Sequence, residues 1–190
     1  MNRRQFLAGA SAGLAVTAAG CTGAVPFLGD ADQYDTDDPE AVAESWALLT
    51  ETLWNDPDTW LEQRANVFHS RSARMDDDIE QDIAFFRNNG ERTVKEIVNS
   101  NTTVRNPTPA QIREFLLSTA SASDGRYEYL SDEFINRLGS EEIESAFVDV
   151  RFQTDVPATE EPIAIEARCL VAVEDGEWQV LEAAEESGFS

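Results

Sequence analysis

The clearest pattern in the chain is the alternation of apolar and polar residues near its C-terminus. Apolar residues occupy every second position of 148–152 and again of 163–173, as in strands with one buried face. Asp175-Gly176 is a typical two-residue hairpin turn. In the segment that follows, 177–183, Trp178 and Val180 fall on the inward side. The pattern predicts three antiparallel strands that close with a long hairpin.

The part before these strands has a mainly helical pattern. Asp38-Pro39 and Asp56-Pro57 each place an N-cap residue before a proline, which predicts helices beginning at those prolines. The segment 92–105 favours a strand with an irregularity near 99–101. Further helices are predicted from apolar spacing in three segments: 76–89, the stretch opening at Thr108-Pro109, and 131–138. The pattern is that of an α+β fold with N-terminal helices packed on a curved antiparallel sheet.

Residues 1–21 have the layout of an export and anchoring signal. The apolar part, Phe6–Ala19, is roughly 14 residues long, shorter than the ~20 that a helix needs to cross a bilayer. The motif Arg3-Arg4-Gln5-Phe6-Leu7 resembles the twin-arginine export signal, and Ala18-Ala19-Gly20-Cys21 resembles a lipoprotein box. The resemblance implies that 1–20 are removed and that lipid on Cys21 holds the protein at the external face of the cell membrane. An uncleaved N-terminal anchor and a plain cleaved signal are the alternatives.

The charge of the chain narrows the class of partner. Its 190 residues include 14 basic and 37 acidic ones, a formal charge of −23, and loss of Arg3 and Arg4 with the signal leaves 12 basic residues and −25. Such a surface repels phosphate backbones and excludes nucleic acid as a partner. One lysine against 13 arginines, with the acidic excess, resembles proteins of halophilic archaea, in which molar salt screens the repulsion. An acidic protein of an ordinary organism is the alternative.

The chain divides into three segments. Residues 1–20 form the signal, 21–38 form an acidic tether that we expect to be flexible, and 39–186 form a single domain with one hydrophobic core. Two acidic runs are candidate cation sites. Asp30 and Asp32 have calcium-loop spacing, but Asp35 stands where the EF-hand turn needs glycine. The run Asp76–Asp78 suits a hard cation, or a helix start with its dipole.

The order of the elements resembles the nuclear transport factor 2-like superfamily. The residues that carry the resemblance are the first helix, Pro39–Trp54, and the final run Leu170–Leu181, LVAVEDGEWQVL. In that superfamily a cone-shaped sheet packs on helices and leaves a cavity open at one end. Its members include isomerases, dehydratases, cyclases and ligand-binding proteins, so the resemblance implies a fold without choosing a function. The segment 92–138 holds more helix than the middle of that family, which leaves the strand order there open.

Candidate catalytic residues follow from the chemistry that such a cavity requires. Proton transfer needs a carboxylate or histidine in apolar surroundings. The single histidine, His69, is one candidate, and a helix C-terminal cation or a surface group is the other interpretation. Asp149 and Glu166, together with Arg151 and Arg168, form either a charged site or a solvated sheet face with cross-strand ion pairs. With one histidine and no cysteine cluster, phosphate loop or dinucleotide fingerprint, the sequence predicts no metal site and no cofactor.

Two single residues carry modification chemistry. Asn101 begins Asn101-Thr102-Thr103, which matches the glycosylation sequon. Cys169 lies among apolar residues at strand spacing, which is typical of a buried structural thiol rather than a nucleophile. Lipid on Cys21 leaves Cys169 without a disulfide partner, and without that lipid Cys21 is a conceivable one.

The sequence therefore predicts a membrane-anchored extracytoplasmic module that binds a protein or small-molecule partner and has no catalytic role. An isomerase or dehydratase that uses a buried carboxylate is the alternative, and an envelope-assembly component is a third interpretation.

Replacement of Cys21 tests the anchor. The substitution Cys21→Ser removes the thiol that lipid would modify, so we expect the protein to move from the membrane fraction to the medium. Fractionation and immunoblotting of the two versions measure this, and an unchanged distribution would contradict anchoring through Cys21.

Overall fold

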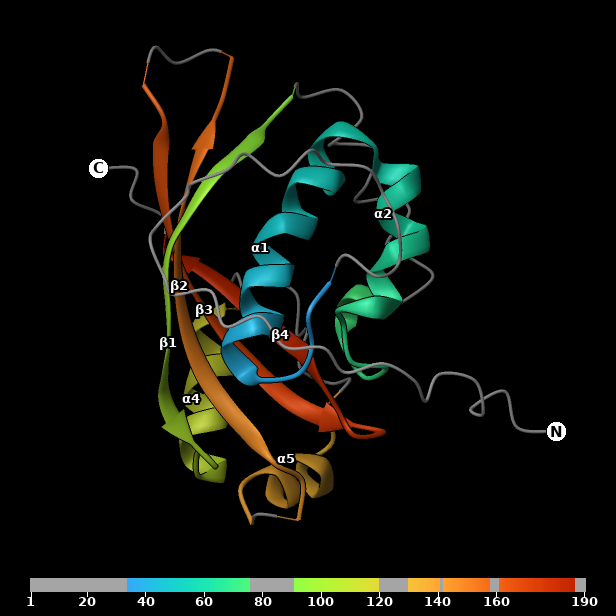
Figure 1. Ribbon diagram of the computed structural model, residues 1–190. Helices are drawn as coiled ribbons and strands as arrows, with labels where there is room; N and C mark the ends of the chain where they lie inside the picture. Colours follow the sequence, from blue (N-terminus) through green and yellow to red (C-terminus); the bar gives the residue numbers. More distant parts are fainter. Residues whose placement is uncertain (1–33, 76–90, 120–129, 141, 158–160, 187–190) are drawn as a thin grey trace, which may run out of the picture.

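The computed structural model describes residues 34–75, 91–119, 130–140, 142–157 and 161–186. In these residues a curved four-stranded sheet lies between two groups of helices (Figure 1). The first group, α1 (Pro39–Asn55) and α2 (Pro57–Gln63), lies on the concave side of the sheet, and the second, α4 (Pro109–Thr119) and α5 (Asp132–Leu138), lies on the opposite side. The α+β class predicted from the sequence is confirmed.

All neighbouring strands of the sheet are antiparallel. The order β1-β2-β3-β4 follows the sequence, with β1 at Thr93–Arg105, β2 at Ser145–Asp155, β3 at Ile163–Glu174 and β4 at Glu177–Glu186. The predicted strand in 92–105 is confirmed, and its register with β2 shifts on both sides of 99–101. In the β3–β4 turn, Asp175 has φ 54° and Gly176 has φ 91°, the left-handed conformations that a two-residue turn of this type requires.

The helices begin where the capping signals predicted. The Asp38 carboxylate accepts a hydrogen bond from the Ala41 N–H at 2.8 Å, and Asp56 does the same for Thr59 at 3.2 Å. Both interactions satisfy N–H groups that have no partner within the first helical turn. The Ser131 hydroxyl caps α5 in the same way. The helix predicted over 76–89 lies outside the described residues.

The folded domain extends further toward the N-terminus than the expected boundary at Pro39. Tyr34 is buried, and its hydroxyl donates to Gln63 Oε1 at 2.8 Å. The Asp35 N–H donates to the Ser45 hydroxyl of α1, and the Thr36 carbonyl accepts from the Trp178 N–H at 3.1 Å. The last residues of the expected flexible tether, from Tyr34 onward, are therefore part of the packed structure.

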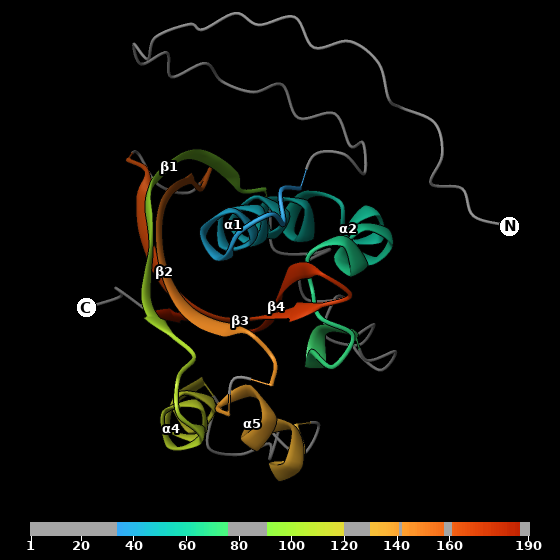
Figure 2. The same ribbon diagram turned by 60° about the horizontal axis from the view of Figure 1, so that its bottom comes forward.

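The sheet buries apolar residues on both faces, but over different lengths. On the concave face, Val148, Val150 and Phe152 of β2 pack against α1 and α2. On the opposite face, Phe147 of β2 and Leu170 of β3 pack against α4 and α5. Figure 2 shows the sheet curling around α1, with α4 and α5 on its convex side, near one end. The other end of that outer face carries charged residues, because neither α4 nor α5 packs against it.

Both edges of the sheet have partners within the domain. Carboxylates of α1 bind edge strand β1: Glu51 accepts from the Val94 N–H at 2.7 Å and Glu40 from the Thr102 N–H at 3.0 Å. On the β4 edge, Val180 forms a parallel bridge with Phe68. Covered edges of this kind hinder pairing with strands of other molecules.

Candidate functional site

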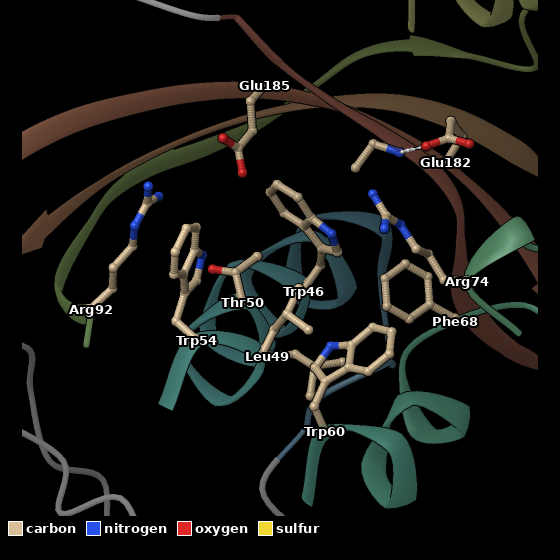
Figure 3. Close-up of a pocket in the computed structure, with 12 residues that line it drawn as sticks. Trp46, Leu49, Thr50, Trp54, Trp60, Phe68, Arg74, Arg92, Glu182 and Glu185 are labelled. Atoms are coloured by element: carbon tan, nitrogen blue, oxygen red, sulfur yellow. Dashed lines mark hydrogen bonds between the residues drawn. The ribbon is translucent and has the colours of Figure 1, made fainter. Parts of the chain in front are cut away.

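A cavity of about 500 Å³ lies between α1, β4 and the part of the chain that runs from Trp60 in α2 to Arg74 (Figure 3). Its volume falls within the roughly 300–1,000 Å³ of small-molecule sites. Helix α1 contributes one wall through residues three to four positions apart and their neighbours, namely Trp46, Leu49, Thr50, Leu53 and Trp54. β4 contributes another wall through Glu182, Ala183 and Glu185.

Aromatic rings form most of the apolar lining. Trp46 packs edge-on against Phe152 of the sheet, with ring centroids 6.1 Å apart, and Trp60 packs in the same way against Phe68 at 6.1 Å. Only 6% of Trp46 and 2% of Trp60 is exposed. These contacts fix the orientation of the rings, so the apolar wall is present before a ligand arrives.

One end of the cavity is formed by an arginine that is held at two points. The Arg92 guanidinium lies over the Trp54 ring, with Cζ 3.7 Å from the ring centroid. Asn55 fixes the Arg92 backbone, because its Oδ1 accepts from the Arg92 N–H at 3.0 Å and its Nδ2 donates to the Arg92 carbonyl at 2.7 Å. Burial lowers the pKa of Arg92 and the charge of Glu185 raises it. Arginine remains protonated under such shifts, so this end carries a fixed positive charge.

A second arginine, Arg74, lines the cavity on the side of Phe68 and Glu182 (Figure 3). Its backbone is fixed locally, since Arg64 Nη1 donates to the Arg74 carbonyl at 2.9 Å and the Arg74 N–H donates to the Ser72 hydroxyl at 3.2 Å. Glu182 Oε1 accepts from the Ala183 N–H at 3.1 Å. The cavity thus combines an aromatic body with two guanidinium groups and two carboxylates, those of Glu182 and Glu185.

His69 lies outside this cavity and is not the surface group that one interpretation described. It is 3% exposed and packs against the Phe134 ring at 5.6 Å. Its Nδ1 accepts from the Arg71 N–H at 3.0 Å and lies 3.6 Å from Glu174 Oε2. Burial lowers the pKa of His69, against an opposing effect of Glu174 and together with Arg71. The ring is therefore neutral at pH 7. Its contacts with Glu174 and Phe134 connect the segment 67–69 to the β3–β4 hairpin and to α5.

Asp149 and Glu166 lie on the charged part of the outer sheet face, away from the aromatic cavity. Arg168 Nε donates to Asp149 Oδ1 at 2.6 Å, and Arg151 Nε lies 3.4 Å from Glu166 Oε1. The four side chains are between 42% and 55% exposed. They line a shallow groove of about 300 Å³. Exposed ion pairs of this kind contribute about 0–1 kcal/mol each, which fits a solvated face.

The remaining sequence candidates fall in different places. Asn101 is exposed on β1 and lines that groove. Cys169 is buried as a free thiol, and burial raises its pKa well above the usual range, so it is a poor nucleophile. The export motif, Cys21 and Asp76–Asp78 lie outside the described residues.

Sequence reasoning did not single out the cavity residues. The helical spacing of Val42, Trp46, Leu49 and Leu53 makes an apolar stripe along α1, but nothing in this pattern connects Trp54 with Arg92. The signal that could have found it is the position of Trp54, which lies one residue beyond Leu53 and off the Val42–Leu53 stripe. A tryptophan off the buried stripe of a helix often packs against something other than the core.

In comparisons with known proteins, no family model, no curated protein and no solved structure matches the chain. Within the described ranges, no group of three or more His, Cys, Asp or Glu side chains is placed to hold a metal ion. In the same part of the chain, no helix is both long and apolar enough to span a bilayer.

The buried histidine gives a pH dependence of stability. The unfolded chain binds a proton at His69 near pH 6.5, whereas burial lowers the pKa in the folded state. Acidification below about pH 6.5 therefore adds protons to the unfolded state first and lowers the free energy of unfolding. The variant His69→Asn keeps an acceptor for the Arg71 N–H and does not titrate, so we expect a flatter profile between about pH 5 and 6.5.

Urea unfolding in molar KCl across this pH range measures the effect in both proteins. An equal loss of stability in wild type and His69→Asn would contradict the role given to His69.

Proposed function

We propose that the protein is a lipid-anchored module at the external face of the cell membrane that binds a small apolar molecule in the cavity between α1 and β4. The single observation that carries this proposal is the cavity of about 500 Å³ with its wall of Trp46, Trp60 and Phe68. These rings are packed against the core and present fixed apolar edges to the cavity, and burial of apolar ligand surface against them contributes about 25 cal/mol per Å².

The arrangement of elements supports a place for the domain in the nuclear transport factor 2-like superfamily. Helix α1 lies inside a curled antiparallel sheet that ends in a long hairpin with an Asp175-Gly176 turn. The superfamily places its ligand in the space between such helices and the sheet, which is where this cavity lies. Helices α4 and α5 on the outer face are an addition to that plan.

The carboxylates that line the cavity favour binding over proton transfer. An acid–base catalyst of the isomerase type needs a carboxylate in apolar surroundings, where burial raises its pKa toward neutrality. Glu185 is exposed, and its charge raises the pKa of Arg92. Glu182 accepts a backbone hydrogen bond from Ala183. His69, the other candidate, is buried on a different side of the 67–69 segment, against α5. We therefore propose a binding role.

The anchor part of the proposal rests on the N-terminal motif. The twin-arginine signal exports proteins that are already folded, and lipid on Cys21 would then attach the chain to the membrane a short stretch of sequence before Tyr34, the first residue that the structure describes. The domain would sit close to the membrane surface, within reach of molecules that partition into it.

Filling the cavity tests the proposed function. N-phenyl-1-naphthylamine is a neutral apolar probe whose fluorescence rises in apolar sites, and we expect saturable binding to the wild-type protein in molar KCl. In Thr50→Trp, a large ring projects from α1 into the cavity and should abolish most of this binding. Thr119→Trp is the matched control, because both hydroxyls donate to the carbonyl three residues earlier in a helix. Equal binding by all three proteins would contradict the proposed site.

A further inference from the structure

We propose that the ligand of this cavity is an amphipathic carboxylate with a ring-containing apolar body, and that Arg92 binds its carboxylate group. This inference rests on the proposed function, because it specifies the chemistry of a ligand in the same cavity.

The first argument is the distribution of charge. The whole chain has 14 basic and 37 acidic residues, whereas the cavity wall has two arginines and two glutamates. The charged groups of the cavity wall therefore balance, unlike those of the strongly acidic chain as a whole. In molar salt, charges more than about 3 Å apart are largely screened, so a negatively charged ligand responds mainly to the groups that it contacts.

The second argument is the preorganisation of Arg92. Stacking on Trp54 and the two Asn55 hydrogen bonds hold the side chain and its backbone in place. An arginine that is already ordered loses little rotamer entropy on binding, and its planar fork matches the geometry of a carboxylate. Stacking uses the face of the guanidinium, whereas a carboxylate binds at its N–H edge. The two contacts are compatible.

The third argument is the nature of the partner that Arg92 has now. Glu185 is the acidic residue whose charge acts on Arg92, and it is exposed at the end of β4. A solvated carboxylate keeps most of its hydration and gains little from the pair. When the rings of a ligand are buried against Trp46 and Trp60, its carboxylate lies in a less hydrated place. The ion pair between that carboxylate and Arg92 is stronger there.

The aromatic lining of the cavity favours a ring-containing apolar body in the ligand. Indole and phenyl rings with fixed orientations favour flat rings, which stack with centroids about 4.5–7 Å apart. A single negative charge fits better than two, because Glu182 and Glu185 line the same cavity.

Two probes of the same shape separate the charge from the body: 2-naphthoate and its neutral amide, 2-naphthamide. Calorimetric titration of the purified, detergent-solubilised chain in molar KCl should show naphthoate binding tighter than naphthamide by about tenfold to a hundredfold, the range expected for hydrogen bonds to a charged group. Arg92→Gln should lower naphthoate affinity by about tenfold to a hundredfold, which brings it to within a few-fold of naphthamide affinity. The naphthamide affinity also reports that the variant is folded.

Three further measurements sharpen the assignment. Arg113→Gln makes the same charge change at an exposed site on α4 and should leave both affinities as they are. Arg92→Lys keeps the charge without the planar fork and should keep only part of the preference. Decanoate carries the same carboxylate on a flexible chain and should bind more weakly than naphthoate.

The possible failures are distinguishable. If neither naphthalene probe binds, the proposed function itself is wrong. If both bind equally, or if Arg74→Gln rather than Arg92→Gln removes the preference, the cavity is a binding site and the role of Arg92 is wrong. Tighter binding of decanoate would overturn the ring-containing body.

Discussion

The packing of α1 inside the concave face of the sheet is the contact on which the rest of the structure depends. Trp46 lies against Phe152 in the centre of that contact, and burial of one such side chain contributes about 1.5–3 kcal/mol. The same helix binds edge strand β1 through Glu40 and Glu51. Its last turn holds Arg92 through Asn55 and Trp54. One helix thus organises the inner core, closes one sheet edge and forms a wall of the cavity.

The cavity exists because the inner space is not filled along the whole length of α1. Toward the middle of the sheet, Val150 and Phe152 meet the helix directly. Near the end of β4, where the register with β3 shifts beside Leu181, the cavity is lined by Ala183, a small residue. The acidic excess of the chain lies largely outside this space, and the arginines at its two ends make it locally balanced. An acidic exterior is compatible with molar salt, while the interior offers a place for a ligand that the exterior would repel.

The sequence predicted the elements well wherever a local signal determined them. Asp38-Pro39 and Asp56-Pro57 marked helix starts because capping is a short-range interaction, and the period-two pattern of 163–173 identified β3 because its inner face is buried or half-buried throughout. Local patterns could not assign α4 and α5 to the outer face, since Phe147 and Leu170 look like irregularities in an alternating strand until their partners are known. Nor could they reveal that Tyr34 packs against α2, or that Arg92 meets Trp54 across 38 residues of chain. Residue type alone pointed to His69, Asp149 and Glu166 as catalytic candidates. In the fold, His69 is a buried packing residue, and Asp149 and Glu166 form ion pairs on a solvated sheet face.

The most direct test of this account is a crystal structure of the protein with 6-bromo-2-naphthoate, in which anomalous scattering locates the bromine. The account predicts a bromine peak inside the cavity beside Trp46, with the carboxylate at the guanidinium edge of Arg92. A cavity filled by the protein's own side chains, or a probe bound only on another surface, would contradict it.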